Sequence, residues 1–312
     1  MPIDPTLVAA LVELGVPMPP ESADVVEQRK LAVEYERAVY PRLGLPAPEL
    51  PIRDHLVPVD GYPDVRVRVF RPRETDAPLP VCLFFFGGAW RQGGLHHPSV
   101  AATCALRAAR ADVVVAAVDY ALAPENPYPA AVEQAYAALE WLVRDAAALG
   151  VDPGRIAVAG QSSGANIAAV LTHLNRDRAE HPIALQILEV PCVDLTLAHL
   201  DRTAAELTDE QWASLERVID QYVPSAADRV RASPLLATDF AGLPPAHIVT
   251  AEVDPLRGDG EAYAAALAGA GVPVAAIRLI GATHESAVYE RVSATARAAQ
   301  AGIAHALRDL HR

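Results

Sequence analysis

Apolar residues follow two different periods along the chain. Residues 65–70 read Val-Arg-Val-Arg-Val-Phe, so that valine alternates with arginine. This alternation predicts a strand with one buried face and one solvated face. After Pro80 the pattern changes to short apolar runs separated by segments with helical spacing. The runs cover residues 81–86, 113–118, 156–159, 184–190, 247–253 and 274–280, and the helical segments cover about 97–110, 129–149, 163–179, 258–270 and 286–310. Such alternation predicts an α/β fold in which helices cover both faces of a mostly parallel sheet.

Two parts of the chain fall outside this rhythm. Residues 5–15 and about 22–43 carry apolar side chains at helical spacing, ahead of a proline-rich stretch. Between residues 193 and 234 the alternation stops for about 40 residues, which is longer than an ordinary crossover connection. Within this interruption Thr208-Asp-Glu-Gln211 has the capping-box pattern that opens a helix.

The interruption follows the carboxyl end of a strand, which is where ligands bind in open α/β sheets. We therefore expect a helical cap made from the insertion at residues 193–234 and an N-terminal helical arm at residues 1–48. The core is expected to comprise residues 49–192 and 235–312.

Composition and charge narrow the classes of protein that remain. The 312-residue chain is 52% hydrophobic, which is enough for a large core. Its net charge of −13, with an isoelectric point near 5.2, disfavours binding to nucleic acid or to anionic membrane surfaces. The three cysteines lack CxxC spacing, as expected for reduced thiols, and the N-terminus lacks the pattern of a signal peptide. We expect a cytoplasmic protein that binds neither nucleic acid nor membranes.

Gly160-Gln-Ser-Ser-Gly164 lies between an apolar run and a predicted helix. A serine in a tight strand-to-helix turn forms the nucleophile elbow of many serine hydrolases, and its flanking glycines relieve crowding between strand and helix. The helix N-terminus, including the N–H of Ser163, would face an oxyanion formed beside Ser162. The alternative is a glycine-flanked helix start without chemistry. The context favours Ser162 as a nucleophile.

A serine hydroxyl needs a base to accept its proton and an acid to orient that base. In elbow-containing folds these follow in the order serine, acid, histidine. Asp254 comes directly after the run 247–253, and His284 comes shortly after the run 274–280. We therefore predict Asp254 as the acid and His284 as the base. Glu252, two residues earlier, is the alternative acid.

The chain also resembles a known family, the hormone-sensitive lipase group of α/β-hydrolases, also called bacterial family IV esterases. The resemblance extends from about residue 25 onward. The segments that carry it are Asp119-Tyr120-Ala-Leu-Ala-Pro-Glu125, Pro129-Ala-Ala-Val-Glu, Val151-Asp-Pro-Gly-Arg-Ile-Ala-Val-Ala-Gly, and Asp254-Pro-Leu-Arg with Gly260-Glu-Ala-Tyr. The resemblance implies an α/β-hydrolase fold with a two-part helical cap. It also implies a triad of Ser162, Asp254 and His284 and hydrolysis of short to medium acyl esters without cofactor or metal.

The oxyanion loop departs from the family pattern. The family reads His-Gly-Gly-Gly before an aromatic residue, and this chain reads Phe86-Gly87-Gly88-Ala89-Trp90. The backbone N–H groups of Gly87 and Gly88 can still form an oxyanion hole with that of Ser163. Two interpretations of Phe86 and Ala89 remain open. The first is a loop that is repacked with apolar contacts and otherwise normal. The second is a pocket adapted to an unusual substrate, or a weakened hydrolytic reaction.

Three further departures lie near the predicted site. Gln161 stands where the family usually has Asp or Thr, Glu285 follows His284, and Glu189 replaces an apolar residue at a strand end. Glu285 could raise the pKa of His284 or simply face water. A buried carboxylate such as Glu189 must find a partner or act on the substrate. The residues that we assign to the substrate pocket are Phe86, Ala89, Trp90, Gln161 and Glu189.

The sequence thus predicts a serine hydrolase that cleaves a short or medium acyl ester, or a specialised ester or lactone, through an acyl-serine intermediate. A transacylase or an amide or formamide hydrolase would use the same triad. A non-catalytic ligand-binding protein on this fold is the alternative from another class. The expected partner is a small-molecule ester, and the resemblance adds a possible homodimer.

Overall fold

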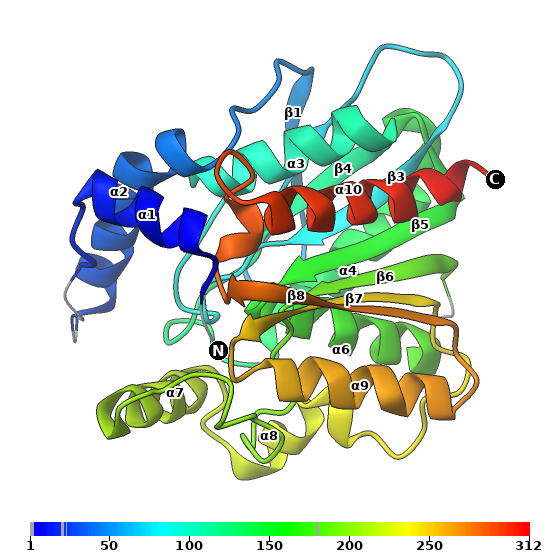
Figure 1. Ribbon diagram of the computed structural model, residues 1–312. Helices are drawn as coiled ribbons and strands as arrows, with labels where there is room; N and C mark the ends of the chain where they lie inside the picture. Colours follow the sequence, from blue (N-terminus) through cyan, green and yellow to red (C-terminus); the bar gives the residue numbers. More distant parts are fainter. Residues whose placement is uncertain (1–2, 20–21, 23, 179–180) are drawn as a thin grey trace.

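One eight-stranded sheet runs through the molecule in the order β1-β2-β4-β3-β5-β6-β7-β8. The computed structural model describes residues 3–19, 22, 24–178 and 181–312 (Figure 1). The strands are β1 (Ile52–Val57), β2 (Val65–Phe70), β3 (Leu79–Phe85), β4 (Val114–Asp119), β5 (Val151–Gln161), β6 (Ile183–Glu189), β7 (Ala246–Val253) and β8 (Val274–Thr283). β1 and β2 pair antiparallel at one edge, and the strands from β4 to β8 run parallel.

Helices cover both faces of this sheet. They are α1 (Pro5–Leu14), α2 (Val25–Leu43), α3 (Pro98–Ala111), α4 (Ala130–Arg144), α5 (Ala146–Leu149), α6 (Ser163–Arg178), α7 (Asp209–Tyr222), α8 (Ala226–Arg231), α9 (Arg257–Gly269) and α10 (Ala294–Arg308). α3 and α10 pack against each other on one face, whereas α4, α6 and α9 lie on the other (Figure 1). The expected mostly parallel sheet between two helical layers is confirmed.

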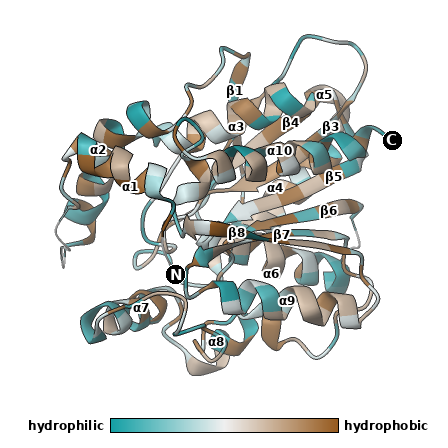
Figure 2. Cartoon of the chain, in the orientation of Figure 1, coloured by the Kyte–Doolittle hydropathy of each residue, from teal (hydrophilic) through white to brown (hydrophobic). Residues whose placement is uncertain are grey.

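The burial of the strands explains their sequence patterns. Every residue of β3 is buried, because helices cover both faces of the sheet at its centre. In β2, near the edge, Val65 and Val67 are buried while Arg66 is exposed, as the alternation predicted. Figure 2 shows the apolar residues gathered in the strands, while the helices carry both apolar and polar residues.

The segments outside the strand–helix rhythm form helices at the carboxyl-end side of the sheet. α7 opens with both hydrogen bonds of the predicted capping box, between Thr208 and Gln211. α2 is capped by Asp24, whose carboxylate accepts the N–H groups of Val26 and Glu27. In Figure 1, α1 and α2 lie beside one end of the sheet and α7 and α8 below it. No helix in the described ranges is both long enough and apolar enough to cross a membrane.

Candidate active site

Ser162 occupies the turn between β5 and α6. Its φ of 53° is in the left-handed region, where a residue with a side chain is strained. A Cβ atom at Gly164 would lie 2.2 Å from the Phe85 carbonyl oxygen, so only glycine allows the helix to approach β3 this closely. The N–H of Ser162 donates to the Glu189 carbonyl oxygen at 2.8 Å, which holds the turn against the end of β6. These features give the strand-turn-helix geometry that the sequence predicted.

Asp254 and His284 meet Ser162 at the carboxyl ends of their strands. Asp254 follows β7, and His284 follows β8. His284 Nδ1 lies 2.7 Å from Asp254 Oδ2, and His284 Nε2 lies 2.9 Å from Ser162 Oγ. A neutral imidazole that donates from Nδ1 to the carboxylate presents an unprotonated Nε2 to the hydroxyl. The arrangement can therefore remove the Ser162 proton.

The electrostatic surroundings of His284 favour its protonated form. Burial lowers the pKa of His284, but the charge of Asp254 and its hydrogen bond to the imidazole, together with the charge of Glu285, raise it overall. The carboxyl of Asp254 is almost fully buried, so little water screens this interaction. Glu285 is exposed to water, as one of the two interpretations held, and its charge is the smallest of these effects on the pKa of His284.

Glu252, the alternative acid, points elsewhere. Its Oε2 atom accepts the N–H of Gly281 at 2.8 Å, and this hydrogen bond joins the end of β7 to the last residues of β8. Asp254, and not Glu252, therefore carries the hydrogen bond to His284.

The loop of residues 86–90 lies directly beside the nucleophile. A Cβ atom at Gly87 would lie 3.4 Å from the Ser162 Cβ atom. Gly88 has a φ of 131°, and its carbonyl oxygen accepts the N–H groups of Arg91 and Gln92 in a tight turn. Among the described residues, no other group takes up the N–H groups of Gly87 and Gly88. Together with the Ser163 N–H at the start of α6, they can act on a developing negative charge.

Phe86, one of the predicted pocket residues, lies in the interior of the protein. The Phe86 ring is buried and stacks on Tyr120, with ring centroids 4.3 Å apart and an interplanar angle of 16°. The Tyr120 hydroxyl also donates to the Phe86 carbonyl oxygen at 2.8 Å. Of the two interpretations given above, the structure supports a loop repacked with apolar contacts.

Ala89 and Trp90 continue the loop toward the α7 side. Both have a positive φ, 54° and 55°, which is uncommon for residues with a side chain. The Trp90 ring stacks on Tyr222 at the end of α7, with centroids 4.5 Å apart and planes at 6°. Through this pair the loop beside Ser162 is in contact with the helical insertion.

Glu189, another predicted pocket residue, lies in the interior with its carboxylate paired. Its side chain is only 1% exposed, and Arg107 Nη2 lies 2.5 Å from its Oε1 atom. Gln300 Nε2 donates to its other carboxylate oxygen at 3.1 Å. Of the two possibilities for a buried carboxylate, Glu189 has found partners. Sequence reasoning did not identify Arg107, Gln300 or Tyr120 as neighbours of the site.

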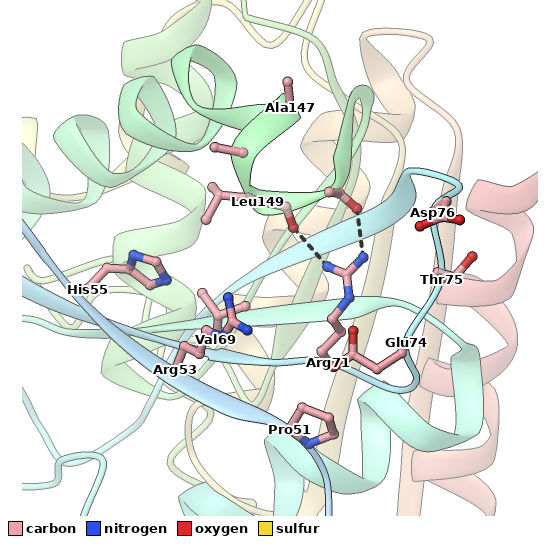
Figure 3. Close-up of a pocket in the computed structure, with 12 residues that line it drawn as sticks. Pro51, Arg53, His55, Val69, Arg71, Glu74, Thr75, Asp76, Ala147 and Leu149 are labelled. Atoms are coloured by element: carbon pink, nitrogen blue, oxygen red, sulfur yellow. Dashed lines mark hydrogen bonds between the residues drawn. The ribbon is translucent and has the colours of Figure 1, made fainter.

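A hollow of about 300 Å³ lies at the opposite end of the sheet (Figure 3). Arg71 closes one side of it by donating to the carbonyl oxygens of Leu149 at 2.8 Å and Gly150 at 3.3 Å. Gly150 precedes β5, so the hollow is at the amino end of that strand, whereas Ser162 is at its carboxyl end. It is therefore separate from the candidate active site.

Comparison with known proteins adds an independent view of the fold and the family. A family described as having the alpha/beta hydrolase fold matches residues 82–288. Carboxylesterase NlhH of Mycobacterium tuberculosis is 42% identical over 255 residues, which cover 78% of each chain. Carboxylic ester hydrolase LipN of the same species is 37% identical over 297 residues, 90% of this chain and 76% of LipN. A solved hyperthermophilic esterase from the archaeon Pyrobaculum calidifontis has a TM-score of 0.87 and 33% identity, covering 100% of this chain and 99% of that one.

Proposed function

Because the chain belongs to the hormone-sensitive lipase group of the α/β-hydrolase fold family and is a carboxylic ester hydrolase, we propose that Ser162, His284 and Asp254 carry out its reaction. The observation that carries this proposal is the unbroken pair of contacts from Asp254 through His284 to Ser162. An isolated serine hydroxyl is a poor nucleophile, and this arrangement supplies both the base and the group that orients it.

The reaction proceeds in two halves. Ser162 Oγ attacks the ester carbonyl carbon while its proton passes to His284 Nε2. The N–H groups of Gly87, Gly88 and Ser163 stabilise the oxyanion of the tetrahedral intermediate. His284 then gives its proton to the alkoxy oxygen, so that the alcohol leaves and an acyl ester of Ser162 remains.

Water completes the reaction. His284 Nε2 accepts a proton from the attacking water, and the second tetrahedral intermediate collapses to release the carboxylic acid. The proton on His284 returns to Ser162 Oγ. Throughout both halves Asp254 stays ionised and stabilises the imidazolium by accepting its Nδ1 proton in a hydrogen bond.

The helices at residues 1–48 and 193–234 act in this proposal as the cap that bounds the substrate. On the N-terminal side, Arg29 Nε donates to the Arg91 carbonyl oxygen at 2.7 Å. The same guanidinium donates to the Ala123 carbonyl oxygen and to Glu125. Tyr222 covers Trp90 from the other side.

Ala89, Trp90 and Gln161 remain the proposed pocket residues. We propose a short or medium acyl ester, or a specialised ester or lactone, as the substrate.

We also propose that the protein acts in the cytoplasm and forms a homodimer. The cytoplasmic location is supported by Cys82, Cys104 and Cys192, which are buried and free. The dimer is supported by β8, an edge strand whose Ile280 side chain is 65% exposed.

A fluorophosphonate probe tests the nucleophile directly. We expect one covalent adduct on Ser162, located by peptide mass spectrometry, together with loss of hydrolysis of p-nitrophenyl butyrate. Ser162→Ala should abolish the adduct and lower kcat at least about 10³-fold, because the variant lacks the nucleophilic hydroxyl. A folded wild-type protein that gains no adduct at Ser162 would refute the proposal.

A further inference from the structure

A buried charged cluster lies behind the nucleophile, on the side of α3 and α10. Glu189, Arg107 and Gln300 are 1%, 2% and 5% exposed. Besides the contacts of Glu189 described above, Arg107 Nη2 donates to Gln300 Oε1 at 3.1 Å. The three side chains thus contact one another and connect a strand end to two helices. We refer to them as the Glu189 cluster.

This cluster connects directly to the two turns that carry Ser162 and His284. On one side, the backbone carbonyl of Glu189 accepts the N–H of Ser162 at 2.8 Å. On the other side, Gln300 Nε2 donates to the Ala287 carbonyl oxygen at 3.2 Å. Ala287 belongs to the short helical turn Ser286–Val288 that follows His284. A continuous path of hydrogen bonds therefore joins the elbow to the turn of the base.

Two residues linked to Glu189, Ser162 and Val190, have a strained backbone. Ser162 has a φ of 53°, and Val190, directly after Glu189, has a φ of 41°. A positive φ is a true outlier for a β-branched residue such as valine, and it persists only where surrounding contacts hold it in place. Glu189 is linked to both residues, because its carbonyl oxygen accepts the N–H of Ser162 and Val190 follows it in the chain, so its anchored side chain is such a contact.

Stability alone does not account for a buried ion pair here. Replacing such a pair with apolar residues of similar volume is often neutral or stabilising, because taking two charges out of water is costly. Arg107 Nη1 even lacks a hydrogen-bond partner among the described residues. The backbone carbonyl of residue 189 would be present with any side chain, but only polar side chains can both anchor that residue and donate to the turn after His284. Arg107 and Gln300 anchor Glu189, and Gln300 donates to Ala287.

We propose that Glu189, Arg107 and Gln300 are positioning residues, which fix the Ser162 elbow and the His284 turn relative to each other. The inference rests on the proposed roles of Ser162 and His284. None of the three side chains touches the reacting atoms. They act by keeping Ser162 Oγ and His284 Nε2 within hydrogen-bond distance, and a misplacement of about 1 Å between reacting groups can cost about 100-fold in rate.

Gln300→Met tests the link to the His284 turn. Methionine keeps the length of the side chain and leaves the Arg107–Glu189 pair in place, but it cannot donate to Ala287. We expect kcat on p-nitrophenyl butyrate to fall at least about tenfold with little change in KM. We also expect the acidic limb of kcat/KM against pH to move to lower pH, because a looser turn weakens the hydrogen bond by which Asp254 raises the pKa of His284.

Gln186→Met is the matched control. Gln186 is also a buried glutamine, and it donates to the carbonyl oxygen of Pro244, just before the start of β7, at 2.9 Å. We expect a similar loss of thermal stability but wild-type kcat and an unshifted pH profile. The double variant Arg107→Met/Glu189→Leu, with the ion pair replaced by apolar side chains, should fold but show the same fall in kcat.

The outcomes separate this inference from the proposed function. Wild-type kcat and an unshifted pH profile in folded Gln300→Met would overturn the positioning role, whatever the double variant does. An equal fall of kcat in Gln186→Met would overturn it as well, since the loss would then reflect stability alone. A wild-type protein with neither ester hydrolysis nor fluorophosphonate labelling of Ser162 would instead overturn the proposed function, and this inference with it.

Discussion

His284 stands between two carboxylates of different kinds. Asp254 is buried and hydrogen-bonded to the imidazole, whereas Glu285 follows in the chain and acts only through its charge. Since both raise the pKa of His284, a larger fraction of the imidazole is protonated near neutral pH than in an unperturbed histidine. Protonated His284 cannot accept the proton of Ser162, so the proposed mechanism predicts that activity depends on pH through this group.

Glu285→Gln measures the smaller of the two effects. Because the charge of Glu285 raises the pKa of His284, its removal should lower that pKa. The acidic limb of kcat/KM should then move to lower pH, from a wild-type position above the ordinary histidine value of about 6.5.

Glu74→Gln serves as the control, because Glu74 lines the hollow at the far end of the sheet. Its profile should match the wild type. A limb that stays in place or moves to higher pH in Glu285→Gln would contradict the electrostatic assignment.

At this scale the sequence predicted the residues that follow strands better than the residues that face helices. Ser162, Asp254 and His284 could be picked out because each comes directly after an apolar run, where parallel strands end at one edge of the sheet. Glu189 could not be paired, since Arg107 is 82 positions away and Gln300 is 111 positions away. Arg107 itself shares a helix face with the buried Cys104 and Ala111, which is a signal of a buried charge.

Among the elements, the loop of residues 86–90 has the conformation that is hardest to predict from its sequence. Its conformation depends on Tyr120, which both stacks on the Phe86 ring and donates to the Phe86 carbonyl. A histidine is thus not needed to hold the loop. Gly93 adds to this packing, because a Cβ atom there would lie 2.6 Å from the Phe86 ring.

Phe86→His/Ala89→Gly restores the family pattern and tests this account. We expect kcat on p-nitrophenyl acetate and butyrate to stay the same or fall, because an imidazole buried against Tyr120 loses stacking area and leaves ring nitrogens to be satisfied. A thermal melt should show a lower Tm for the double variant. A clear rise of kcat would mean that the native loop is a weakened one.

The boundaries of elements were also harder to predict than their existence. The run 156–159 marked β5, yet the strand begins at Val151 and contains Pro153 and Gly154. These residues break strand propensity, and the pairing of β3 with β5 shifts its register between Leu79 and Val81 as a result. Polar sequence at a strand's exposed start carries too little periodicity to be read as a strand.

At the scale of the whole molecule, both edges of the sheet expose apolar side chains. β1 and β8 are the edge strands, and each exposes a large apolar residue, Leu56 at 67% and Ile280 at 65%. The fold class followed from the order of apolar runs and helices, because only a parallel sheet covered on both faces buries such runs. The assembly does not follow in the same way, because an exposed edge residue has the same sequence signature whether or not a second copy covers it.

Ile280→Lys tests the proposed dimer at β8. We expect the wild type to elute as a dimer in size-exclusion chromatography with light scattering, and the variant to weaken the dimer at least about tenfold, since a lysine on an edge strand opposes edge-to-edge pairing. Leu56→Lys, an equally exposed position on β1, should leave the dimer intact. A wild-type protein that is monomeric across micromolar concentrations would rule out the proposal.

The stacking of Trp90 on Tyr222 has a consequence for anyone who redesigns this enzyme. Trp90, which contacts the cap through Tyr222, belongs to the loop of residues 86–90. The same loop carries the N–H groups of Gly87 and Gly88 that are proposed to bind the oxyanion. Selectivity and turnover should therefore not be separable traits. Directed evolution that remodels α7 for bulkier esters is expected to pass through variants slower on every ester, until a second mutation in the loop restores the lost rate.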